Sequence, residues 1–159
     1  MAEFSRYEVY MIFNQSKPLW LCGADLSGLD LRGVNLEGAV LIGANMSKCH
    51  LRGADLREAN MGGAILQDAI MVGADLRRTY LRGADLRGAD LREANLVESD
   101  MFEANLSGTN LLDANMGGAD LTSANLTDAN LSGTNAPDYK ILRAKSLKGA
   151  IMPDGTTYE

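Results

Sequence analysis

Every fifth residue from Leu21 to Leu131 is leucine or methionine, without exception over twenty-three consecutive repeats. Residues of a helix are rotated by about 100° each, so positions five apart differ by about 140° and form no single stripe. In a straight strand, an odd spacing sends successive leucines to opposite faces. The pattern is satisfied when the chain turns a corner in each repeat and every leucine or methionine points to a common axis. The sequence therefore predicts a solenoid.

A second, small residue comes two positions before each leucine. It is alanine in most repeats, and its variants include Thr79, Ser99 and Thr109. The two-residue spacing places it inside as well, so that large and small side chains together fill a narrow tube with no lumen for a substrate. The residue between them is usually Asp or Asn, and the pair after the leucine is often a polar residue and glycine, which favours a turn.

These repeats resemble those of a known family. Gly-Ala-Asp-Leu-Arg at 53–57, 73–77 and 83–87, and Glu-Ala-Asn-Leu at 103–106, are similar to the Ala-(Asp/Asn)-Leu-x-x pattern of the pentapeptide-repeat proteins. The resemblance implies an all-β fold, a right-handed quadrilateral β-helix with four repeats in each coil. We expect this β-helix over residues 19–135, as five full coils and most of a sixth.

Both flanks of the repeat are expected to be caps. In residues 1–18, the run Ser5 to Glu8 is typical of a capping box and predicts a short helix over 5–13. The alternation of aromatic and apolar residues in the same segment leaves a strand as the alternative.

At the other end, residues 136–159 are expected to hold a short helix and a tail. The period breaks at Ala136-Pro137, and the pattern after it predicts a capping helix from Asp138 to Leu147 that ends before Gly149. The segment 150–152 could then form a last extended stretch across the coil. Such endings resemble those of cyanobacterial pentapeptide-repeat proteins.

The charge of the chain limits its partners. The formal net charge is -6, and the pI is about 4.8, which argues against a protein that binds nucleic acid directly. No run of 18 or more apolar residues and no basic-then-apolar start is present, so we expect a cytoplasmic protein with no membrane partner.

Residues for chemistry are sparse. Cys22 and Cys49 belong to no CxxC motif, and His50 beside Cys49 gives too few ligands for zinc. We find no Ser/His/Asp arrangement, no phosphate-binding glycine loop and no paired carboxylates in a cleft. We therefore expect no catalytic residue, no metal and no cofactor, and a small-molecule enzyme that uses Cys49, His50 or an arginine column is the least favoured alternative.

The outward charges fall into two spans. Residues 52–92 contain seven arginines and six acids, which leaves a net charge of +1, and we expect these charges to pair with one another. Residues 93–135 contain seven acids and no Lys or Arg, so this half should carry an acidic field. Most Asp and Asn side chains before the leucines, such as the column from Asn35 to Asn135, are expected to bond to the turn backbone.

Several outward positions, which are polar in most repeats, hold apolar residues instead. Trp20, Val40 and Tyr80 share a column beside Ile42 and Phe102, and a contiguous apolar row suggests a partner surface. The candidate interaction residues are Val40, Ile42, Tyr80, Phe102, Glu93, Glu98, Asp100 and Glu103.

The sequence favours a non-catalytic protein-protein interaction or regulatory module, without naming its partner. The alternative is a DNA mimic that binds a topoisomerase such as DNA gyrase, because the quinolone-resistance branch of the family resembles duplex DNA in size, shape and acidity and protects gyrase in this way. The acidic span supports that alternative. The lack of an inserted loop, the near-neutral middle and the lack of an evident C-terminal dimerisation segment argue against it. A homodimer through a coil end or the apolar face is a further possibility.

Overall fold

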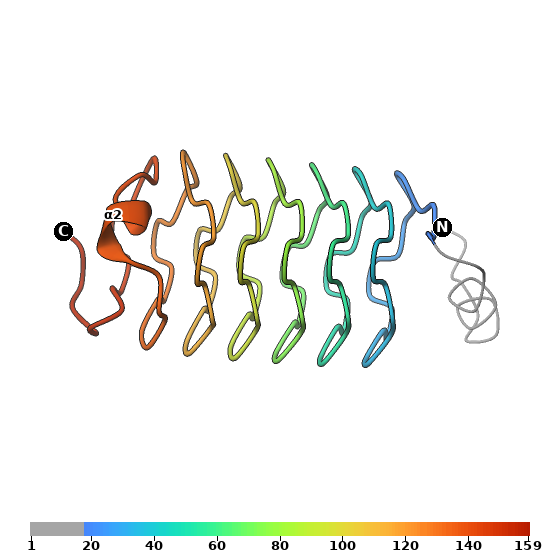
Figure 1. Cartoon of the computed structure of the whole chain (residues 1–159), viewed down its shortest axis with the longest axis horizontal. Coiled ribbons are helices and arrows are strands. Elements are labelled where there is room, and N and C mark those ends of the chain that lie inside the picture. The colour runs from blue at the N-terminus through green and yellow to red at the C-terminus, as the bar shows by residue number, and fades with distance from the viewer. Residues whose placement is uncertain (1–17) are drawn as a thin grey trace.

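The computed structural model describes residues 18–159, which wind as a stack of coils along one long axis (Figure 1). Residues twenty apart are joined by parallel bridges, from Trp20 with Val40 to Asn110 with Asn130. Each coil therefore contains four repeats, as the sequence predicts. The expected N-terminal helix or strand over residues 5–13 lies outside the described residues.

Each corner of the coil is a four-residue turn. In the first of them, the N–H of Ala24 donates to the carbonyl of Leu21 at 3.2 Å, and Gly23 has a φ of 64°. A positive φ at the third position is the requirement of a type II turn, and glycine meets it at the lowest cost. The same position also accepts other residues, such as Glu98 with a φ of 58°. Pairing with the coils on both sides holds these residues in a conformation that they rarely adopt alone.

The core is the filled tube that the repeat predicts. From Leu36 to Leu131, every leucine or methionine of the five-residue register is at most 1% exposed. The alanines two positions earlier are buried with them. The first described coil departs from the small-residue rule, because Leu19, Leu29 and Val34 stand at that position and pack against the end of the core.

Most polar residues at the small inward position are bonded to the backbone, whereas the buried hydroxyl of Thr134 has no partner among the described residues. The hydroxyl of Thr109 donates to the carbonyl of Leu86 at 2.9 Å, and the thiol of Cys49 donates to the carbonyl of Leu26 at 2.8 Å. Burial raises the pKa of the Cys49 thiol to about 11, so this thiol remains protonated at neutral pH. These substitutions fill space in the core.

The C-terminal helix is shorter than the sequence predicts. Helix α2 spans Asp138–Ile141 and lies near the C-terminal end of the stack (Figure 1). The prediction of a helix up to Leu147 is therefore wrong beyond Ile141. Ile141 is fully buried and stands twenty residues after Leu121, so it occupies the inward position of a seventh coil. Beyond it, the backbone pairs with the coil below, which a continued helix would prevent.

The seventh coil continues after a one-residue bulge. In a regular coil, the N–H and the carbonyl of one residue both bond to the coil below. Here two residues share this role. The N–H of Lys145 donates to the carbonyl of Ala124 at 2.7 Å, and the carbonyl of Ser146 accepts from the N–H of Leu126 at 2.9 Å. Two residues thus stand opposite Asn125, which is the arrangement of a β-bulge. The extra residue shifts the pairing distance from twenty to twenty-one residues.

The chain ends in an antiparallel hairpin on the last coil. Ile151 pairs in parallel with Asn130 and antiparallel with Thr157. The N–H of Tyr158 donates to the carbonyl of Ala150 at 2.8 Å. This hairpin covers part of the backbone edge that a parallel coil leaves open. Among the described residues, no helix has the length and apolar character needed to cross a membrane.

Candidate functional site

The Asp and Asn residues before the leucines have a structural role in the turns. A side-chain oxygen of Asn110 accepts from the backbone N–H of Leu112 at 3.2 Å, and that of Asp90 accepts from Arg92 at 3.3 Å. The predicted bonding of these side chains to the turn backbone is confirmed. Most carboxylates of the repeat are therefore not free for chemistry.

Arginines that follow Asp-Leu fold back onto their own aspartate. The guanidinium of Arg92 donates from Nε and Nη2 to the two carboxylate oxygens of Asp90, at 2.8 and 2.7 Å. Its guanidinium holds the pKa of the Asp90 carboxyl below the usual range. The same fork joins Arg32 to Asp30, Arg57 to Asp55, Arg77 to Asp75 and Arg87 to Asp85.

Six of the seven arginines in residues 52–92 pair with a carboxylate, through these forks or across coils, which confirms the predicted pairing for most charges of this span. Two N–H groups of each forked guanidinium are already bound to a carboxylate, so the arginine columns present little unpaired positive charge. They do not form a basic stripe for a phosphate backbone.

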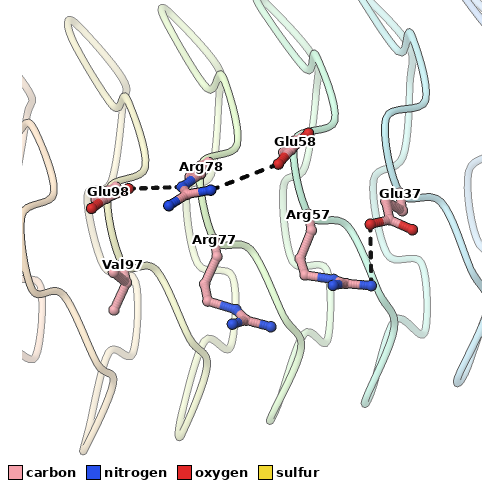
Figure 2. A pocket seen from close by; sticks show the side chains of 7 residues that line it. All are labelled: Glu37, Arg57, Glu58, Arg77, Arg78, Val97 and Glu98. Carbon is pink, nitrogen blue, oxygen red and sulfur yellow. Dashed lines mark hydrogen bonds and ion pairs between the residues drawn. The ribbon is translucent and has the colours of Figure 1, made fainter.

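One corner of the rod has a shallow hollow lined by charged residues of neighbouring coils (Figure 2). Arg57 Nη2 lies 3.2 Å from Glu37, and Arg78 Nε lies 2.8 Å from Glu98. Because these arginines are all paired with carboxylates, the hollow is a poor site for a free anion. The lining residues are Glu37, Arg57, Glu58, Arg77, Arg78, Val97 and Glu98. Sequence reasoning missed this hollow, whose only signal is the spacing of about twenty residues between its members.

A different arrangement occurs where Tyr80 replaces the aspartate before Arg82. Arg82 Nη1 donates to Asp100 of the next coil at 3.0 Å, and its guanidinium lies 4.5 Å from the centre of the Phe102 ring. The N–H of Phe102 donates to Asp100 at 3.1 Å. Tyr80 is 53% exposed and pairs with Asp100 through the backbone. We call Tyr80, Arg82, Asp100 and Phe102 the Tyr80 cluster.

The structure brings some of the predicted interaction residues together and separates others. Tyr80, Asp100 and Phe102 lie in the Tyr80 cluster, and Glu103 is the corner residue after Phe102. Val40 and Ile42 stand two coils below on the same face, because Val40 pairs with Asn60 and Asn60 with Tyr80. The predicted apolar row is thus interrupted at Asn60. Arg82 was missed, although its spacing of twenty residues from Phe102 could have indicated the contact.

The acidic residues of 93–135 are spread over several corners. Glu93 and Glu98 belong to two corners other than that of the Tyr80 cluster. Glu98 is bound by Arg78, and Asp100 is bound within the cluster. The C-terminal segment also places Lys140 at this end, where its Nζ donates to the carbonyl of Gly118 at 2.7 Å. The acidic field predicted for this half is therefore divided between faces and partly neutralised.

The residues considered for catalysis do not meet. Cys49 is fully buried and turned inward, whereas its neighbour His50 is exposed on the outside. Between residues 18 and 159, no group of three or more His, Cys, Asp or Glu side chains could hold a metal ion.

Comparison with protein families matches the description "Pentapeptide repeats", in eight copies over residues 21–38, 35–71, 69–104 and 99–135. The comparison with curated proteins gives no match. Among solved structures, a pentapeptide repeat protein of the Arabidopsis thaliana thylakoid lumen is 30% identical, with 73% of this chain and 74% of that chain covered and a TM-score of 0.45.

Two further structures are also similar. HetL of the cyanobacterium Nostoc sp. strain PCC 7120, a pentapeptide repeat protein involved in heterocyst differentiation regulation, is 30% identical over 87% of each chain, with a TM-score of 0.31. A trypsin-treated form of QnrB1, a plasmid-mediated fluoroquinolone resistance protein, is 20% identical over 79% of each chain, with a TM-score of 0.35.

Proposed function

This chain belongs to the pentapeptide-repeat family, and we propose that it is a non-catalytic module that presents the outer faces of a rigid rod to another protein. We also propose that its coil is right-handed and four-sided, as the resemblance to the family implies. A core filled along its whole described length supports a role on the outside, because it leaves no internal space for a small molecule.

The Tyr80 cluster is the observation that carries this proposal. Tyrosine and arginine are enriched among the residues that contribute most to protein interfaces. Tyr80 is 53% exposed, and Arg82 is held in place by Asp100 and the Phe102 ring. A partner therefore meets side chains that are already ordered, which lowers the entropy cost of binding.

The surroundings of the cluster suggest the character of the partner. Glu103 is exposed on the same corner, and Arg82 already has a carboxylate partner in Asp100. We propose that the partner provides an apolar pocket for Tyr80, with basic side chains at its rim. Complementary charges at such a rim raise the association rate more than the affinity.

The proposal is tested with the Tyr80→Ala and Phe102→Ala variants. Protein partners are captured from the source cells with the wild-type rod, and their affinities are then measured by calorimetry. Loss of an aromatic side chain at the centre of an interface costs about 2 kcal/mol or more, so we expect affinity to fall roughly thirtyfold. Ile65→Ala, an exposed apolar change on another face, is the matched control and should leave the affinity unchanged. Equal binding by all variants, or no partner at all, would contradict the proposal.

A DNA mimic that binds DNA gyrase is the second candidate. The seven acids and the lack of Lys or Arg in residues 93–135 favour it. Against it, Glu98 and Asp100 are bound by arginines, and the other acids are divided between faces. A supercoiling assay decides the matter: if micromolar protein changes neither gyrase activity nor its inhibition by a quinolone, this candidate is removed.

Association of the rod with itself is a separate question. A second copy could dock on the face of the Tyr80 cluster or on a coil end. Light scattering of the wild type and of Tyr80→Ala distinguishes these cases. A dimer that the substitution abolishes would place the self-contact on the cluster.

A further inference from the structure

Arg52 is the exception among the arginines of the described repeats. The residue two positions before it is His50, so the aspartate that would bind its guanidinium is missing. The other arginines of residues 18–135 each have a carboxylate within ion-pair distance, whereas Arg52 has none. Its exposed guanidinium therefore has its donor groups available to a partner.

Aliphatic side chains stand next to Arg52 in the coil above. His50 pairs with Ile70 through the backbone, and the N–H of Gly53 donates to the carbonyl of Val72 at 3.1 Å. Ile70 and Val72 thus lie one coil above His50 and Arg52, at the spacing of about 4.8 Å between paired strands. Ile70 is 37% exposed, and Val72 is 9% exposed. A cation and a small aliphatic surface are therefore adjacent.

Arg52 and Lys48 place two cations near this part of the rod, although the protein as a whole is acidic. Lys48 is exposed on the neighbouring corner. Asp30 and Asp90, in the column of His50, are each held by the arginine two residues after them. Asp68, one coil above Lys48, is exposed and places a carboxylate on that neighbouring corner. No acid of this neighbourhood is bound to Arg52.

We infer that the surface formed by Lys48, His50, Arg52, Ile70 and Val72 binds a short acidic segment of a partner protein. A carboxylate of the segment receives the two parallel N–H bonds that Arg52 offers, and an aliphatic side chain packs on Ile70, beside the nearly buried Val72. A peptide fits better than a nucleic acid, because the aliphatic surface adds nothing to phosphate binding. This surface belongs to another corner than the Tyr80 cluster, so either proposal can fail alone.

The test uses a synthetic probe, the capped pentapeptide Glu-Glu-Leu-Ile-Glu, and isotope-labelled full-length protein. We expect saturable NMR shifts at the Arg52 Nε–H group and at the methyl groups of Ile70 and Val72, with weaker binding at high salt. Arg52→Gln should lower the affinity about tenfold, since a charge-assisted hydrogen bond contributes about 1.5 kcal/mol or more. Arg92→Gln is the matched control, because Arg92 stands two coils above in the same column and is held by Asp90; it should bind the probe as the wild type does.

Several outcomes would overturn the inference. One is the absence of saturable shifts at these groups, and another is equal loss of affinity in Arg52→Gln and Arg92→Gln. A third is that inorganic phosphate, or a probe with serine in place of leucine and isoleucine, binds as well as the original, which would make this surface a general anion site. Tyr80→Ala should bind the probe normally, and loss of binding there would contradict the separation of the two surfaces.

Discussion

The coils of residues 52–92 and those of residues 93–135 have the same kind of core. They differ in the hydrogen bonds and ion pairs that their outward side chains form. In the first span, Arg92 and its neighbours form forks with aspartates. In the second span, asparagines bond to one another across coils, as between Asn135 Nδ2 and Asn115 Oδ1 at 2.8 Å. In both spans, a side-chain oxygen accepts the N–H of the corner. This acceptor oxygen comes from either a charged or a neutral group, and the corner after Tyr80 forms without it.

This difference shows where function can reside. Exposed ion pairs contribute little to stability, so the outer charges can change without loss of the fold. Positions where an aspartate is replaced and an arginine remains therefore stand out, as at His50 with Arg52 and at Tyr80 with Arg82. Both proposed surfaces are built on such replacements.

The first prediction concerns the shared core and has the largest expected effect. Leu86→Ala and Leu126→Ala remove fully buried side chains, one from each span. Each should lower the free energy of unfolding by about 3 kcal/mol, because the narrow tube cannot close the cavity. Urea unfolding measures both, with Ser107→Ala as a control at a half-buried outward position. Costs that differ clearly between the two leucines would show that the cores of the two spans are not equivalent.

The second prediction concerns the corner glycines. A Cβ at Gly133 would meet the carboxylate of Asp113 one coil below, whereas a Cβ at Gly108 would meet nothing, and both residues have a positive φ. Gly108→Ala should cost about 1 kcal/mol and Gly133→Ala about 2 kcal/mol, as measured by urea unfolding.

A double-mutant cycle separates the steric part of this cost from the backbone part. Combined with Asp113→Ala, the substitution at Gly133 should cost no more than the one at Gly108. If the extra cost persists in the double variant, the contact with Asp113 is not its cause. Gly88, which faces Asp68 in the first span, should behave as Gly133 does.

The third prediction concerns the pH dependence of the arginine forks. Arginine forks lower the pKa values of Asp75, Asp85 and Asp90, and that of Asp30 to about 2. Because these values lie below the unfolded value of about 3.9, the forks stabilise the fold above about pH 4. This stabilisation is lost as the pH falls from about 4 toward about 2. The urea midpoint should therefore decrease over this range.

A variant with these four aspartates changed to asparagine provides the control. It keeps the acceptor oxygens and should lose less stability on acidification than the wild type does. Equal losses in both proteins would mean that the forks do not respond to pH as their geometry indicates.

The fourth prediction has the smallest effect and compares a charged acceptor of the first span with a neutral acceptor of the second span. Asp85 accepts from Arg87, and Asn105, one coil above, accepts from Ser107 and from Asn125. Asp85→Ala and Asn105→Ala should each cost about 1 kcal/mol or less. High salt should reduce the cost at Asp85 and leave that at Asn105 unchanged, since salt screens only the ion pair. A salt response at both positions would contradict the distinction between the charged and the neutral acceptors.

The core and the corners could be predicted from the sequence, whereas the outer contacts could not. The inward direction of Leu36 or Leu131 follows from a spacing that no helix or strand can accommodate. The contact of Arg82 with Phe102 depends on which rotamers pack across two coils, and the pattern of one repeat does not contain that information. The hollow between Arg57 and Arg78 arises in the same way from residues of neighbouring coils.

The C-terminal segment shows the same limit. The local pattern predicts a helix up to Leu147, because the apolar residues after Asp138 have a spacing that fits successive helical turns. The helix ends at Ile141, since the open edge of the sixth coil offers backbone partners that Lys145 and Ser146 take. A one-residue bulge then hides the continued repeat from a search for a period of five.

The sequence by itself determined the period, the inward residues and the turns, because each is decided within five residues by side-chain size and backbone preference. Tertiary structure alone decided how each arginine is paired, where helix α2 ends and which outward groups meet, because these depend on residues about twenty positions apart. Stacking of the coils brings those residues within a few ångströms of one another, and the candidate surfaces of the protein arise there.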